Sequence, residues 1–228
     1  MTFLIAEISN HHLGSVDKAK ELILAAKNSG ADAVKSQAFV AADMLKWGTM
    51  PLSFYEKCAM SLDEYRELIA FGRDNGIPVF FTVLSPGLLA LSSFQQYQKL
   101  HAGGWKAASL ATIYRMDREN TFISMNAPRE DVPEIHAAKI LYATPYQKDV
   151  CVAEYEALQK FYDGKAIGVS HHGEECGFLL LMHQIYYLPY VEKHFYMGKQ
   201  ISEGSMVYRD CNHSYDPVRF EKLAKDLK

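Results

Sequence analysis

Eight apolar segments of strand length alternate with helical patterns along this 228-residue chain, and that alternation limits the fold more than any other feature. Strands that alternate with helices predict a parallel sheet, and eight such units close a barrel. We therefore expect an α/β fold, a compact (β/α)8 TIM barrel, since about 250 residues is typical of that fold. The expected strands are 3–9, 33–39, 78–84, 104–109, 121–126, 139–144, 166–171 and 190–197.

Helix boundaries support the same interpretation. A capping box at Ser61 and Glu64 predicts the start of a helix, and Gly30 suits the left-handed residue that ends an earlier one. Segment 40–60 is expected to be a long loop, and loops of that length often carry function. Connections after strands four and five have room for shortened helices only. The expected helices are 16–28, 61–75, 87–98, 152–162, 175–187 and 217–228.

Composition excludes several classes of protein. The net charge of -3 and the lack of a basic face argue against nucleic-acid binding. Apolar runs are interrupted before 18 residues, and the N-terminus enters a strand without a basic leader, so we expect neither a membrane span nor a signal peptide. Four scattered cysteines without a CxxC pattern predict free thiols in a cytoplasmic protein. We expect a single domain over 1–228.

Polar residues gather at the C-terminal ends of the expected strands, where a barrel of this kind opens into its active site. One such residue can be half of a buried ion pair or bond to backbone. A polar group on every strand would be a costly way to build a core. In chain order they are Glu7, Asn10, Lys35, Gln37, Thr82, Lys106, Ser109, Ser124, Asn126, Thr144, Ser170, His172, Glu192 and His194.

Two lysines and two hydroxyls predict an anion site. Lys35 and Lys106 lie on the second and fourth expected strands, near Thr82 and Ser109. This combination suits a phosphate, a carboxylate, or a small molecule that carries both.

Two histidines on neighbouring strands predict a metal site. His172 and His194 suit a divalent ion with open positions that acts as a Lewis acid. The alternative is one metal-free, hydrogen-bonded histidine and one that faces solvent, because neutral imidazole is also a plain hydrogen-bonding group. Glu7 and Glu192 can bond substrate hydroxyls, move a proton or support the ligands. His171 should point away from the site by strand alternation.

These residues stand in motifs that resemble those of the sialic acid synthases (N-acetylneuraminate synthases). IAEISNHHLG at 5–14 resembles the family's IAEIGNNHNG, and GADAVKSQ at 30–37 resembles GADAVKFQ. Phe80-Phe81-Thr82 falls where the family has FSTPF. The motifs KAAS at 106–109, GVSHH at 168–172 and VEKHF at 191–195 resemble KxxS, GYSDH and VEKHF. Asp210, followed by Ser214 and Pro217, fits a downstream aspartate motif.

The resemblance implies a transferase that forms a C–C bond. Such an enzyme condenses phosphoenolpyruvate with an N-acetylated amino sugar similar to N-acetylmannosamine, giving a sialic-acid-like nonulosonic acid and phosphate in carbohydrate and polysaccharide biosynthesis. By resemblance, Mn²⁺ or Mg²⁺ is the cofactor. The implied phosphoenolpyruvate-binding residues are Lys35, Thr82, Lys106, Ser109 and Ser170, the metal ligands His172 and His194, the sugar-binding residues Gln37, Tyr146, Glu192 and Asp210, and the catalytic residues Glu7, Lys35, Lys106, His172, Glu192 and His194.

The sequence also departs from the family pattern. The chain ends after its eighth helix, so we expect the C-terminal antifreeze-like domain of the family to be absent, and a homodimer or a separate antifreeze-like subunit becomes a candidate partner. Ser36, Phe81 and Val83 alter the pocket wall, which leaves the acceptor sugar open. A catalytically degenerate barrel that binds a partner in surface-glycan biosynthesis is the alternative. A different barrel lyase or aldolase that reuses the metal is a third hypothesis.

Overall fold

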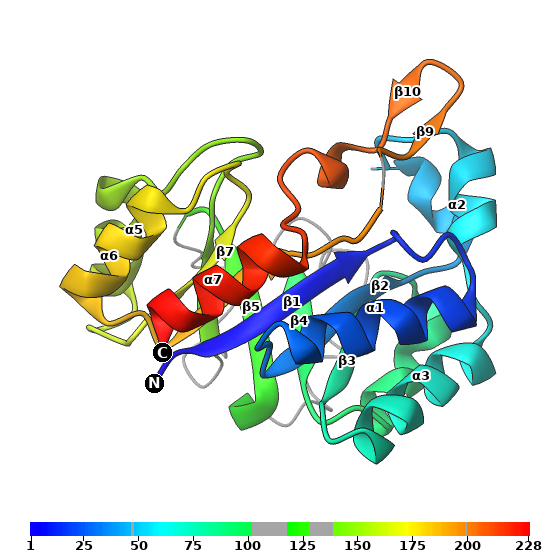
Figure 1. The fold of residues 1–228 in the computed structure, drawn as a ribbon, viewed down its shortest axis with the longest axis horizontal. Coiled ribbons are helices and arrows are strands. Elements are labelled where there is room, and N and C mark those ends of the chain that lie inside the picture. The colour runs from blue at the N-terminus through cyan, green and yellow to red at the C-terminus, as the bar shows by residue number, and fades with distance from the viewer. Residues whose placement is uncertain (47, 102–117, 128–138, 199) are drawn as a thin grey trace.

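The computed structural model describes residues 1–228 except 47, 102–117, 128–138 and 199. Eight parallel strands close into a barrel in the order of the chain, with β1 hydrogen-bonded to both β2 and β8 (Figure 1). This confirms the predicted (β/α)8 fold. The strands are β1 Phe3–Ser9, β2 Ala33–Ala38, β3 Val79–Val83, β4 Gln98–His101, β5 Thr121–Met125, β6 Lys139–Ala143, β7 Gly168–His171 and β8 Tyr190–His194.

Helices cover the outside of the barrel. The described α-helices are α1 Val16–Asn28, α2 Leu52–Cys58, α3 Leu62–Asp74, α5 Val152–Phe161, α6 Gly177–Tyr186 and α7 Pro217–Leu227. The predicted caps are confirmed, because Ser61 and Glu64 form a complete capping box and Gly30 has a φ of +91°. The expected short helices after strands four and five lie outside the described residues.

The position of the fourth strand differs from the prediction. We expected a helix over 87–98 and a strand over 104–109, but β4 is Gln98–His101, and residues 104–109 lie outside the described part of the chain. A 3₁₀ helix, Pro86–Ser93, replaces the expected α-helix. The Gln95 side chain accepts a hydrogen bond from the backbone N–H of Phe81 (3.0 Å). This bond holds the connection against β3, so β4 begins at Gln98 rather than at residue 104.

Segment 40–60, expected to be a loop, contains ordered helices. A 3₁₀ helix, Ala41–Lys46, precedes α2. Side chains from this segment form an apolar cluster with Phe39 and Tyr208. A hairpin of β9 Ser202–Glu203 and β10 Met206–Val207 lies above α2 (Figure 1), held by a 2.8 Å ion pair between Lys57 and Glu203. Segment 40–60 thus packs against residues of the 201–211 segment.

The barrel interior has an apolar floor. Beneath the polar layer, inward-facing side chains pack in a separate cluster that closes the N-terminal end of the barrel; they are Ile5, Ala33, Phe80, Phe122 and Leu141. The larger core lies between the strands and the helices. Because period-two alternation puts residues two positions further along each strand on the same face, the next inward layer contains the polar residues.

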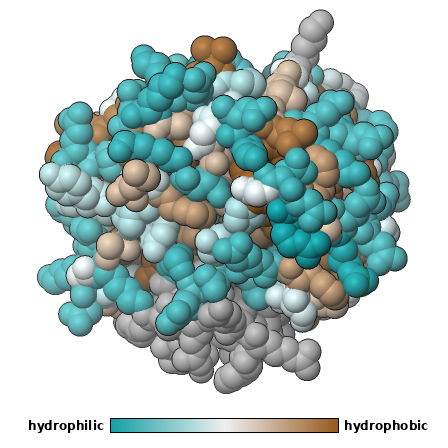
Figure 2. Space-filling view, turned by 60° about the horizontal axis from the view of Figure 1, so that its bottom comes forward, coloured by the Kyte–Doolittle hydropathy of each residue, from teal (hydrophilic) through white to brown (hydrophobic). Residues whose placement is uncertain are grey.

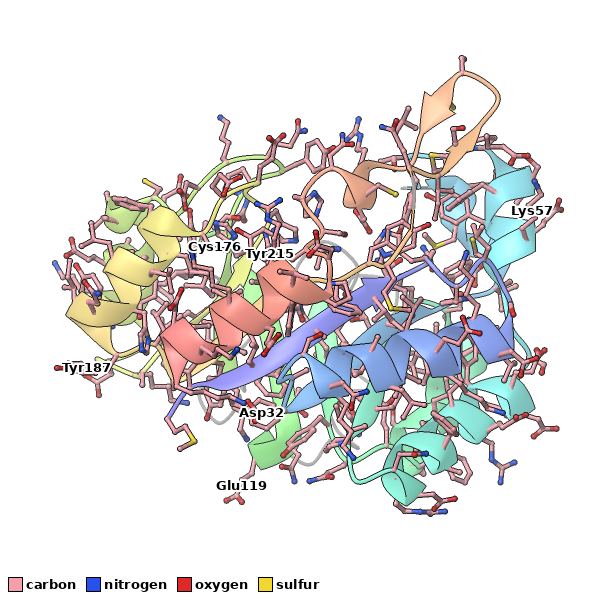
Figure 3. The ribbon with its side chains drawn as sticks, in the orientation of Figure 1. Asp32, Lys57, Glu119, Cys176, Tyr187 and Tyr215 are labelled. Carbon is pink, nitrogen blue, oxygen red and sulfur yellow. The ribbon has the colours of Figure 1, made fainter. Side chains whose placement is uncertain are left out.

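The two chain termini lie close together at one end of the barrel (Figure 1). Asp32, labelled in Figure 3, accepts a 2.8 Å hydrogen bond from the backbone of Leu4 and forms a 2.8 Å ion pair with Lys228. One face of the molecule is mostly hydrophilic, with small hydrophobic areas between polar side chains (Figure 2). Among the described residues, no helix has the length and hydropathy to cross a membrane. All four cysteines are free, as predicted.

Candidate active site

The strand register brings the predicted polar residues into one layer inside the barrel. Glu7 of β1 pairs in register with Lys35 of β2 on one side and with His194 of β8 on the other. Ser170 of β7 pairs with Glu192 of β8. Residues in register on neighbouring parallel strands share a face, so their side chains converge above the apolar floor.

Two lysines and two glutamates form a buried charge network in this layer. Lys35 Nζ contacts Glu7 Oε2 and lies 3.8 Å from Glu192 Oε2, while Lys99 Nζ contacts Glu192 Oε1. Ser170 Oγ donates a 2.7 Å hydrogen bond to the same oxygen of Glu192. All four charged side chains are at least 94% buried, so the network is nearly sealed from water.

Burial and pairing change the proton affinities in the network. Burial lowers the pKa of Lys35 to about 7, against the opposing effect of Glu192. Burial alone would raise the pKa of Glu192, but Lys35 and Lys99 outweigh it and lower that pKa to about 2. Glu192 is therefore a carboxylate at neutral pH.

Lys99 is a site residue that the sequence reasoning missed. The prediction assigned the strand-four lysine to Lys106, which lies outside the described residues together with Ser109. Lys99 is in register with Thr82 of β3 and points into the barrel. Residues 99–103 fell between the expected helix over 87–98 and the expected strand over 104–109, so the sequence reasoning gave Lys99 no role.

Unpaired hydroxyls flank Lys99. Thr82 Oγ1 and Ser124 Oγ are buried, and neither has a hydrogen-bond partner within the described part of the chain. Thr82 is on β3 and Ser124 on β5, the two strands that border β4. Buried polar atoms normally find partners. These two hydroxyls are therefore available to a bound polar molecule.

Histidines and one aspartate gather at the open end of the barrel. Ligand atoms of His194, Asp210 and His213 all lie within 4.8 Å of one another. The His172 ring centroid lies 5.4 Å from that of His194 and 5.5 Å from that of His213. His172 stands outside the 4.8 Å group, beside it. His213 was absent from the sequence prediction, because it lies in a loop and the prediction considered the ends of strands.

The histidines are prepared for metal binding. His172 Nδ1 donates a 2.8 Å hydrogen bond to the carbonyl oxygen of Thr144, which leaves Nε2 free as a ligand. Burial lowers the pKa of His172 to about 3 and that of His213 to about 4, so both rings are neutral near pH 7. Neutral imidazole is the form that binds metal. The residues present therefore fit a divalent ion.

Asp210 is fixed by a hydrogen-bond network with the first strand. Ser9 Oγ and the Tyr208 hydroxyl both donate to Asp210 Oδ2, the latter at 2.7 Å. Asn10 Nδ2 donates to the Tyr208 hydroxyl and to Gln37 Oε1, each at 3.1 Å. The predicted sugar-binding residues Gln37 and Asp210 thus belong to one connected network.

Tyr146, another predicted sugar-binding residue, lies at the edge of this site. Its hydroxyl donates a 3.1 Å hydrogen bond to the Arg209 carbonyl oxygen, and its ring centroid is 5.3 Å from that of His213. It is close enough to the histidine group to form part of the rim.

His171 points out of the barrel, as strand alternation predicted. Its Nε2 lies 3.1 Å from Asp149 Oδ1, and its Nδ1 lies 3.2 Å from Lys193 Nζ. Cys176 and Tyr215, seen side by side near the start of α7 in Figure 3, border this outer cluster. The cluster anchors the helix layer and is separate from the interior site.

Comparison with known proteins agrees with this architecture. No family model matches the chain. It is 25% identical over 250 residues to an uncharacterized protein of Methanocaldococcus jannaschii, spanning all of this chain and 70% of that protein. Over 55 residues it is 51% identical to the N,N'-diacetyllegionaminic acid synthase of Legionella pneumophila, which is 24% of this chain and 15% of that protein.

Solved structures share the fold. The N-acetylneuraminic acid synthetase of Leptospira borgpetersenii superposes with a TM-score of 0.74 at 16% identity, covering 99% of this chain and 82% of that one. The spore coat polysaccharide biosynthesis protein spsE of Bacillus subtilis gives 0.75 at 22% identity, covering 99% and 67%. The chain therefore shares the (β/α)8 barrel fold of these two structures. The resemblance to the sialic acid synthases is confirmed in fold across the chain and in sequence over a shorter stretch.

Proposed function

We propose that this protein condenses phosphoenolpyruvate with an N-acetylated amino sugar similar to N-acetylmannosamine, releasing phosphate and a nonulosonic acid. The observation that carries this proposal is the pair of buried lysines, Lys35 and Lys99, placed beside a histidine and aspartate group inside one barrel. An anion site next to a site for a Lewis-acid metal is what this reaction requires.

The lysine layer is suited to the phosphate and carboxylate of phosphoenolpyruvate. Lys35 and Lys99 supply charge, and Thr82, Ser124 and Ser170 supply hydroxyls around them. Glu7 and Glu192 now neutralise both lysines. Binding this anion therefore requires the lysines to turn from the carboxylates toward the ligand, or one carboxylate to take up a proton. We retain Lys106 and Ser109 as proposed contacts to the same ligand.

Polar residues of the interior and of its open end are suited to the acceptor sugar. Glu7, Gln37, Tyr146, Glu192 and Asp210 offer acceptors and donors for hydroxyl and amide groups. A divalent ion held by His172 and His194 would polarise the aldehyde carbonyl of the acceptor. C3 of phosphoenolpyruvate forms the new C–C bond, water adds at C2, and phosphate leaves by C–O cleavage. Glu192 and Glu7 are placed to hold or move the protons.

Phosphate release from phosphoenolpyruvate, assayed with Mn²⁺ against a panel of N-acetylated hexosamines and related aldehydes, tests the proposal. We expect release that requires both the metal and one acceptor. A variant with Lys20→Ala, a surface residue paired with Glu67, is the matched control and should behave as the parent protein. Phosphoenolpyruvate binding without release under any condition would favour the catalytically degenerate barrel instead.

A further inference from the structure

We propose that His213 is a metal ligand and that, with His194 and Asp210, it makes this site select a transition-metal ion over Mg²⁺. The proposal rests on the metal dependence of the proposed function. The three side chains meet through ligand atoms within 4.8 Å of one another. The His194 and His213 ring centroids are 4.3 Å apart, with the planes at 76°.

Backbone pairing fixes His213 next to the end of β8. The Tyr215 N–H donates to the His194 carbonyl oxygen at 2.8 Å, and the Tyr196 N–H donates to the Tyr215 carbonyl oxygen at 2.9 Å. These bonds form an isolated parallel bridge between Phe195 and Tyr215. The loop that carries His213 is therefore a short extension of the sheet. Its backbone bonds keep His213 beside the end of β8.

The ring nitrogens of His213 need a partner. The side chain is 1% exposed, and within the described ranges neither Nδ1 nor Nε2 has a hydrogen bond. His194 Nδ1 is also buried and unpaired there. A buried polar atom without a partner costs about 1–3 kcal/mol. An ion bonded to His194 and to one ring nitrogen of His213 would supply partners for buried atoms that now lack them.

Asp210 is oriented to complete the group. Among the described residues, the hydrogen bonds that reach this carboxylate go to Oδ2, from Ser9 and Tyr208. The same oxygen lies 3.9 Å from His194 Nδ1, so these bonds hold the carboxylate beside the histidine. Such support of a ligating carboxylate by neighbouring donors is typical of metal sites.

The donor set decides the class of ion. Two imidazoles and a carboxylate, with the His172 ring 5.4 Å from His194, form a nitrogen-rich site. Imidazole suits Zn²⁺, Cu²⁺, Fe²⁺ and Ni²⁺, whereas Mg²⁺ prefers oxygen ligands and retains water. We therefore expect Co²⁺ to bind more tightly than Mg²⁺, and also more tightly than Mn²⁺, which is the weakest binder among the divalent first-row metals.

Titration calorimetry of the full chain with Co²⁺, Mn²⁺ and Mg²⁺, without substrates, tests the proposal. His213→Ala and His213→Gln should each weaken Co²⁺ binding by at least about tenfold, the lower end of what loss of even a supporting residue costs. His183→Ala is the matched control, because His183 lies beside Thr2 at the opposite end of the barrel. Thermal unfolding in EDTA checks that each variant folds.

Two results would overturn the inference. One is parental Co²⁺ affinity in folded His213 variants, which would leave the ion to His172 and His194. The other is Mg²⁺ binding as tight as Co²⁺ binding in the parent protein. Because no phosphoenolpyruvate or sugar is present, neither outcome depends on the condensation activity, and failure of the activity assay would leave this result unchanged.

Discussion

Lys99 on β4 and Glu192 on β8 form an ion pair across the interior of the barrel, and both side chains are almost fully buried. Strands four and eight lie on opposite sides of an eight-stranded barrel, so this pair spans the lumen. The same glutamate also receives Ser170 and lies near Lys35. The pair thus links the proposed anion site to the strand that carries His194.

Breaking this pair should strongly destabilise the protein. Lys99→Ala would leave a buried carboxylate short of a partner, and removing one member of such a pair costs about 3–5 kcal/mol. Lys20→Ala, at the exposed pair with Glu67, should cost at most about 1 kcal/mol. Urea unfolding of both variants measures the difference. Equal losses of unfolding free energy in the two variants would mean that the buried pair stabilises the protein no more than the exposed pair does.

The two strand-four lysine candidates can be separated by ligand binding. Since Lys99 faces the lumen, Lys99→Met should weaken phosphoenolpyruvate binding by tenfold or more, a loss of about 1.4 kcal/mol or more. Lys106→Ala should also weaken phosphoenolpyruvate binding far more than sugar binding if it contacts the phosphate. Calorimetry with each ligand gives the comparison. Equal weakening of both ligands by Lys106→Ala would make that lysine structural.

Metal binding should stabilise the fold through His194. Mn²⁺ at about one hundred times its dissociation constant should add about 2.7 kcal/mol to the free energy of unfolding, and EDTA should reverse the gain. His194→Ala should abolish the metal effect while the EDTA-treated protein still unfolds cooperatively. Thermal unfolding and calorimetry both report on this. Unchanged metal affinity in the variant would remove His194 from the ligand set.

Ser9 has a strained backbone conformation, and its hydroxyl donates a hydrogen bond to Asp210. Its φ is +47°, a conformation that costs a non-glycine residue about 1–2 kcal/mol. Ser9→Ala keeps the strain and loses the hydroxyl, and hydrogen bonds to charged groups contribute about 1.5–3 kcal/mol. Ser9→Gly loses the same hydroxyl but relieves the strain. We expect the alanine variant to unfold at lower urea concentration than the glycine variant, and the reverse order would refute this account.

The capping box of α3 should contribute stability that depends on pH. Hydrogen bonds from the backbone and hydroxyl of Ser61 lower the pKa of Glu64 below its ordinary value of 4.5. A folded-state pKa below the unfolded one stabilises the protein above about pH 4.5, and the effect is lost as the pH falls through the folded value. Ser61→Ala should cost about 1 kcal/mol at pH 7. Unfolding at pH 7 and pH 3 should show a smaller difference between parent and variant at pH 3.

The fold followed from sequence because its determinants are local. These determinants are the alternating strand and helix patterns, the Ser61 capping box and Gly30, and each acts within a few residues. Eight repeated strand–helix units then close into a barrel. Alternation within a strand also separated His171 from His172 correctly. Glu7, Lys35, Ser170, Glu192 and His194 share the interior for the same reason.

Tertiary structure decided the rest, because those features depend on contacts between distant segments. The start of β4, and with it the inward direction of Lys99, depends on how Gln95 bonds to β3. His213 reaches the metal group through backbone pairing of its loop with the end of β8. Ser9 meets Tyr208 and Asp210 from almost the opposite end of the chain. Sequence alone determined the barrel and most of its polar lining, whereas long-range pairing determined which of those residues meet.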